Sequence, residues 1–148
     1  MTKIKLLFVI SDMGLGGAQK ALVTLLNELD PKRYDMAIQL STGAGFNLEY
    51  VPEHVKVLSP FTENNEYYHR FSSLIKEQLK KGRFWVVLRR LFYALLAAVK
   101  GKNSLAAVQY YQWRFVRKYV PGNPYHYDVA IGYLDGLPHY YAMDKVKA

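Results

Sequence analysis

The stretch IKLLFVISDMGLGGAQK, residues 4–20, decides the fold. It opens with Ile4–Ile10, a short apolar run that is typical of a parallel strand buried on both faces. A glycine-rich loop, Ser11–Gly17, follows this run. The next segment, Ala18–Leu29, repeats leucine at helical spacing, which predicts a helix with one apolar face. A buried strand joined to a helix through glycines predicts one unit of an open parallel sheet.

The rest of the chain continues this alternation of strands and helices. Further strands are predicted at Tyr34–Leu40, Val55–Leu58 and Val129–Gly132. A last helix is expected to run to Val146. Helices are also predicted between the third and fourth strands, at Phe71–Lys81, Arg83–Lys100 and Ser104–Val120. The pattern predicts an α/β, Rossmann-like open parallel sheet over residues 1–148, with a helical insertion at about 67–120.

Composition limits the classes of protein to which the chain can belong. Its 148 residues suit one domain, and 51% hydrophobic residues suffice for a core, which argues against disorder. The absence of cysteine excludes disulfides and Cys-based zinc sites, and the four histidines show no metal-ligand spacing. No apolar stretch reaches the roughly 20 residues of a membrane-spanning helix. We therefore expect a cytoplasmic protein without a metal site.

The positive charge is concentrated in one segment. From Lys76 to Lys118 the chain has eleven Lys or Arg and one acid, Glu77, so this segment has a formal charge of +10. The net charge of the whole chain is +8, so the remaining residues together carry −2. A block of one sign indicates an anionic partner such as membrane lipid, nucleic acid or an acidic polymer. The alternative is a solvated helical face without a partner.

The glycine loop suggests a site for an anion. The first N–H groups of a helix have no intrahelical partner and carry partial positive charge, which favours a phosphate at that point. Two known phosphate loops do not fit, because Gln19 replaces the last glycine of the dinucleotide pattern and Ala21 follows Lys20 where the ATP-binding loop needs Ser or Thr. Asp12 either caps the loop or contacts a substrate. A tight turn without a ligand remains the alternative.

A family resemblance starts from the same residues. Gly16–Lys20 after a first strand resembles the G-G-A-[EQ]-[KR] loop of retaining glycosyltransferases of the GT-B fold, family 4 type. Tyr127–Tyr133 and Leu134–Leu137 also resemble the amino-terminal domain of that family. Bacterial members that build capsular or other surface polysaccharides are the most similar. The resemblance covers residues 1–42 and 125–147 and is vague between them.

The resemblance implies sugar transfer from a nucleotide-sugar donor to a glycan or a lipid-linked acceptor. It places the donor diphosphate at Gly16, Gly17 and Ala18. On the acceptor side we assign Met13, Tyr133 and Asp135. The nucleotide sugar is a substrate, and we expect neither a cofactor nor a metal.

The same resemblance also implies a carboxy-terminal domain as partner. This domain would carry an E-x7-E motif, which is absent here, as is the histidine that commonly lines the reaction centre. We therefore assign no catalytic residue and expect that this chain is part of a longer one and is not catalytic alone. The rival hypothesis is a non-catalytic Rossmann-like module that binds a membrane surface or a partner chain.

The second predicted helix of the insertion is amphipathic. Its wide apolar arc consists of Phe84, Trp85, Leu88, Leu91, Phe92, Leu95, Leu96 and Val99. We assign the cations Arg83, Arg89, Arg90 and Lys100 to an anionic membrane surface, which would make the protein peripheral on the inner face of the cell membrane. The arc itself is expected to pack on the sheet or on the next helix. Nucleic acid is not expected as a partner, because no recognised binding signature appears.

Overall fold

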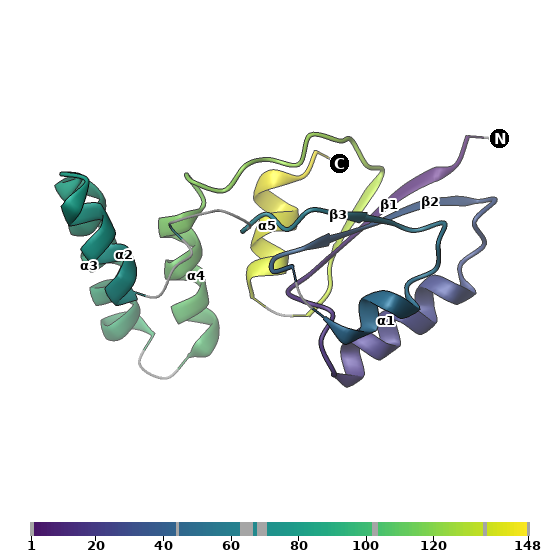
Figure 1. The fold of residues 1–148 in the computed structure, drawn as a ribbon, viewed down its shortest axis with the longest axis horizontal. Coiled ribbons are helices and arrows are strands. Elements are labelled where there is room, and N and C mark those ends of the chain that lie inside the picture. Colours follow the sequence, from purple (N-terminus) through teal and green to yellow (C-terminus); the bar gives the residue numbers. More distant parts are fainter. Residues whose placement is uncertain are drawn as a thin grey trace. The chain divides into compact units, whose positions relative to one another are not determined.

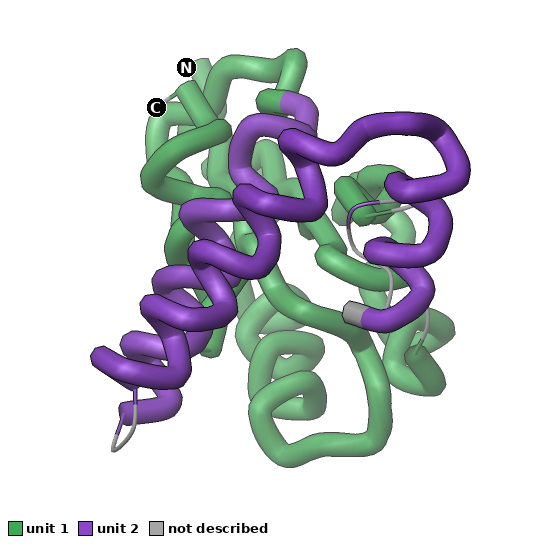
Figure 2. Tube along the Cα trace, turned by 90° about the vertical axis from the view of Figure 1, so that its left-hand side faces the viewer, with its two compact units in different colours: residues 1–63, 122–148 green, residues 64–121 purple. Residues whose placement is uncertain are grey.

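The chain divides into two compact units, which Figure 2 colours separately. The computed structural model describes residues 2–43, 45–62, 67, 71–101, 104–134 and 136–147. The first unit, here called the sheet unit, comprises Met1–Glu63 and Gly122–Ala148. The second, the helical unit, is Asn64–Pro121, so it enters the chain as an insertion between the third and fourth strands.

The sheet unit is built on four parallel strands, β1 (Ile4–Ile10), β2 (Tyr34–Leu40), β3 (Lys56–Leu58) and β4 (Val129–Gly132). Their order in the sheet is β3-β2-β1-β4. Every neighbouring pair is parallel, and β1 pairs with β2 from Ile4 to Ile10. The expected α/β class with an open, Rossmann-like parallel sheet is therefore confirmed.

The two faces of this sheet are covered by different helices. Helix α1 (Gly17–Glu28) buries Leu22 and Leu26 in a core with alternate residues of β1 and β2. Helix α5 (Leu137–Lys145) contacts β4 and β1, and Figure 1 shows it on the other side of the sheet from α1. Burial on both faces explains why β1 is uninterruptedly apolar from Leu6 to Ile10, where Leu7 and Val9 are as buried as Phe8.

A short 3-10 helix, η1 (Phe46–Tyr50), was not predicted from the sequence. It follows β2 and contacts α1. This helix therefore lies beside the first strand–helix connection, where the candidate site is described below.

The helical unit contains α2 (Phe71–Lys80), α3 (Phe84–Lys100) and α4 (Leu105–Val116). Gly82 separates α2 from α3 with a φ of +67°, a conformation that favours glycine. Ser104 caps α4, since its hydroxyl accepts from the backbone N–H of Ala107 at 3.2 Å. Helix α4 ends at Val116, before the predicted end at Val120. Within the described ranges, no helix is long and apolar enough to cross a membrane.

Candidate functional site

The carboxyl edge of the sheet brings three connections together. Ile10 pairs with Leu40, and Val9 pairs with Gly132, so the ends of β1, β2 and β4 lie at the same edge. Ligands of open α/β sheets bind outside this edge. The segments that follow these three strands therefore form the candidate site.

Asp12 organises the glycine loop after β1. Its Oδ1 accepts from the backbone N–H of Gly14 at 2.8 Å and from Nε2 of Gln19 at 3.5 Å. The N–H of Gly16 donates to the carbonyl of Gly14 at 3.0 Å, which closes a tight turn. A carboxylate that accepts from the N–H two residues further along is a turn-forming contact. Asp12 was predicted either to cap the loop or to contact a substrate, and the structure shows it capping the loop.

A second segment supports this loop from behind. The backbone N–H of Asn47 donates to the carbonyl of Met13 at 2.8 Å, and its side-chain Nδ2 donates to the carbonyl of Gly14. Gly45 approaches so closely that an ideal Cβ there would lie 2.1 Å from the carbonyl carbon of Met13. Sequence reasoning missed both residues, and the only signal was the pair of glycines in the loop after β2. The position of the glycine loop thus depends on contacts from η1.

The loop leads into an uncapped helix N-terminus. Gly16 is the N-cap of α1, and within the described part of the chain no side chain caps this helix. The first intrahelical bond runs from the N–H of Lys20 to the carbonyl of Gly16, so the amides of Gly17 and Ala18 lack an intrahelical acceptor. Apart from the adjacent residues and the backbone of the same helix, no heavy atom lies within 4 Å of an ideal Cβ at Gly17. An open terminus with partial positive charge can accommodate an anion.

The three residues assigned to the acceptor side differ in their burial and in whether the structure describes them. The side chain of Met13 is fully buried in the core, and its assignment to the acceptor stays a prediction. The side chain of Tyr133 is partly buried and packs against the same core, while its N–H donates to the carbonyl of Val9 at 2.7 Å. Asp135 lies outside the described residues.

The connection from β4 to α5 is held by backbone conformation and close packing. Leu134 and Gly136 have positive φ angles of 72° and 94°. His139 places Nδ1 2.8 Å from the carbonyl oxygen of Leu134, and because a carbonyl only accepts, Nδ1 carries the proton. An ideal Cβ at Gly132 would lie 2.8 Å from Cα of His139. These contacts give His139 a structural role at this turn.

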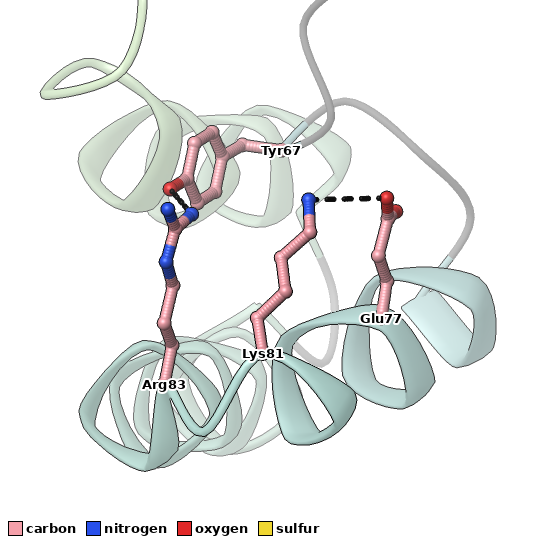
Figure 3. A network of polar contacts seen from close by, with 4 residues as sticks. All are labelled: Tyr67, Glu77, Lys81 and Arg83. Atoms are coloured by element: carbon pink, nitrogen blue, oxygen red, sulfur yellow. Dashed lines mark hydrogen bonds and ion pairs between the residues drawn. The ribbon is translucent and has the colours of Figure 1, made fainter.

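Two of the four cations assigned to a membrane surface lie at the ends of α3. Arg83 donates from Nη1 to the hydroxyl of Tyr67 at 3.1 Å, beside the ion pair of Lys81 and Glu77 at 3.3 Å (Figure 3). Lys100 is the last residue of the helix and is exposed.

The other two cations, Arg89 and Arg90, face α4. Nη2 of Arg89 lies 3.2 Å from the carbonyl oxygen of Arg114 and 3.4 Å from that of Phe115, in the last turn of α4. The guanidinium of Arg90 lies 5.0 Å from the centre of the Phe115 ring, and its burial lowers the pKa of this group. The expected open cationic face of α3 is therefore partly an internal contact with α4.

The apolar arc of α3 is exposed, which corrects the expectation that it packs. Seven of its side chains retain between 45% and 84% of their accessible surface, namely Phe84, Trp85, Leu88, Leu91, Phe92, Leu95 and Val99. From here on, the term apolar arc denotes these seven residues. On the opposite side of the helix, Arg90 and Tyr93 are partly buried. The helix thus presents its apolar side to solvent and its arginines to α4.

Comparisons with protein-family models, with curated proteins and with solved structures gave no match to this chain. The site must therefore be interpreted from its own geometry. Within the described residues, no cluster of three His, Cys, Asp or Glu side chains could hold a metal ion. What remains at the sheet edge is a hydrogen-bonded glycine loop and the amides of Gly17 and Ala18, which no described side chain caps, with open space beside the α-carbon of Gly17.

Proposed function

We propose that this chain is the acceptor-side, amino-terminal domain of a retaining glycosyltransferase that uses a nucleotide sugar. The observation that carries the proposal is the uncapped N-terminus of α1, with open space at Gly17. The resemblance of Gly16–Lys20 to the loop of family 4 enzymes agrees with it. The stereochemical outcome and the sugar class come from the resemblance alone.

The proposed chemistry is electrostatic. When the bond between the sugar and the diphosphate breaks, negative charge develops on the leaving diphosphate. The amides of Gly17 and Ala18 are oriented before the reaction, because Asp12 and Asn47 hold the loop in place. Oriented donors of this kind stabilise developing charge without reorganisation. A side chain at position 17 would occupy the space that a phosphate oxygen needs.

The test of this proposal is sugar transfer by the natural, full-length protein. We would incubate it with radiolabelled UDP-, GDP- and dTDP-hexoses and a membrane extract as the source of acceptors, and measure transfer of label. The proposal predicts transfer from one donor class, with at least a tenfold loss of kcat/KM for Gly17→Val. The matched control is Gly122→Ala, whose Cβ would make only an ordinary contact, 3.5 Å from the carbonyl oxygen of Lys145.

A second readout localises the anion. Inorganic pyrophosphate, titrated into labelled protein, should shift the amide resonances of Gly16, Gly17 and Ala18, and Gly17→Val should abolish these shifts. Shifts confined to lysines and arginines of the helical unit would contradict the proposal. So would transfer activity that Gly17→Val leaves unchanged.

A further inference from the structure

The apolar arc of α3 is the largest feature that sugar transfer leaves unexplained. Trp85 is 84% exposed and Val99 is 67% exposed, although the opposite side of the same helix packs on α4. At a rise of about 1.5 Å per residue, the 17-residue helix is about 26 Å long. An exposed apolar strip of this length marks an interaction surface.

The cations of the helix lie outside this arc. Arg83 precedes the helix and Lys100 ends it, while Arg89 and Arg90 are directed to α4. Along the exposed arc the only polar side-chain group is the indole N–H of Trp85. A surface with so few donors and acceptors suits a partner that needs no hydrogen bonds along the contact.

The charge of the helical unit specifies the partner further. The helical unit, residues 64–121, contains twelve Lys or Arg and two acids, so its formal charge is +10. Lys76, Lys80 and Lys118 are exposed. A second copy of the chain would bring two such units together, and their like charges would oppose the contact. The complementary partner is both apolar and anionic.

We propose that α3 docks on a bilayer of anionic lipid, with its apolar arc in the interface between headgroups and acyl chains. The net positive charge of the helical unit attracts the anionic headgroups. In this arrangement Arg89 and Arg90 hold α4 against α3, and the contact with the acyl chains is made by leucine, phenylalanine and Trp85. The inference does not rest on sugar transfer, because neither a nucleotide nor a sugar enters it.

The test uses vesicles, and the two tryptophans make it specific. Trp113 is 2% exposed and Trp85 is 84% exposed, so Trp113→Phe leaves a single indole on the arc. Addition of phosphatidylglycerol vesicles to this variant should shift its emission to the blue. The shift should be absent in Trp85→Phe, in which only the buried indole remains. Pure phosphatidylcholine should bind at least tenfold more weakly, and high salt should weaken binding to phosphatidylglycerol.

Substitutions in the arc identify the contact. Leu88→Ser combined with Leu95→Ser should lower partitioning in co-sedimentation at least tenfold, because both side chains are exposed in the free protein. Met143→Ser is the matched control, since this side chain is also exposed, at 79%, but belongs to α5. If circular dichroism shows that the double variant loses helix, Trp85→Ser replaces it.

Two results would overturn the proposal. One is the absence of binding to phosphatidylglycerol, or binding that persists in the double variant. The other is a dimer in sedimentation velocity that the double variant disperses, because then the arc binds a second copy. Loss of sugar transfer in an arc variant has no bearing on either result.

Discussion

Gly45→Ala tests how the glycine loop is held. The added Cβ would lie 2.1 Å from the carbonyl carbon of Met13, 2.3 Å from its oxygen and 2.5 Å from its Cα. All three are backbone atoms, so no side-chain rotation relieves the contact. Overpacking of this kind costs about 1–3 kcal/mol. The displacement also weakens two hydrogen bonds from Asn47 to the loop, at about 1 kcal/mol each.

A smaller effect opposes this cost. Alanine stabilises a protein by about 0.4–1 kcal/mol, relative to glycine, where the backbone is compatible with it. The φ of Gly45 is 162°, which is extended backbone, so the conformation itself does not resist alanine. The net destabilisation is then about 2–4 kcal/mol. At roughly 4 °C per kcal/mol for a chain of this size, Tm should fall by about 8–16 °C.

Thermal unfolding followed by circular dichroism measures this change. The control is Gly17→Ala, for which no atom lies within 4 Å of the new Cβ, and we expect Tm within about 2 °C of the unmodified protein. The reasoning would be refuted if Gly45→Ala unfolds at the same temperature as the unmodified protein. It would also fail if both variants are equally destabilised, because the close approach at Met13 would then not be the cause.

Two further predictions concern the contact of α3 with α4 and the burial of a tyrosine in α5. Arg89→Ala should lower the free energy of unfolding, measured in urea, by about 1–3 kcal/mol, because it removes charged donors to the carbonyls of Arg114 and Phe115. The stability of Arg89→Lys should lie between those of Arg89→Ala and the unmodified protein. Equal stability of the two variants and the unmodified protein would exclude the contact. Burial raises the pKa of Tyr141 to about 12 from the ordinary 10.0. The folded state therefore holds this proton more tightly than the unfolded state, so stability is full below pH 10 and falls between about pH 10 and 12. Tyr141→Phe should flatten that part of the pH profile of Tm, and an unchanged slope would contradict the assignment.

The sheet unit was largely predictable because its signals are local. Strands β1 and β2 were predicted at Ile4–Ile10 and Tyr34–Leu40, and the structure has them with the same bounds. The glycine loop was located by its position between a strand and a helix. Its support by Gly45 and Asn47 was not predictable, since the contact joins residues more than 30 positions apart and depends on how η1 returns to β1.

The orientation of α3 was predicted wrongly for a related reason. Helical spacing shows which residues share a side, but not which side the neighbouring helix takes. Phe115 and the last carbonyls of α4 provide ring faces and acceptors for Arg89 and Arg90. These contacts join segments that lie far apart in the sequence, so the apolar arc remains exposed although its composition suggests burial. The hydrogen bonds from Arg89 also occupy carbonyls near the end of α4. The predicted end of this helix, Val120, lies four residues beyond its observed end at Val116.

The pairing of β4 with β1 has a consequence for the order of folding. Strands β1 and β2 are joined by a single helix. By contrast, the backbone amide of Lys5 in β1 donates to the carboxylate of Asp128, which precedes β4 and lies 123 residues further along the chain. The entropy lost on closing a loop grows with its length, so β4 bears the largest cost of any strand. The inserted helices form mainly local contacts, which arise quickly, and their compaction shortens the effective loop. We therefore expect that compaction of the insertion lowers the entropic cost of pairing β4 with β1.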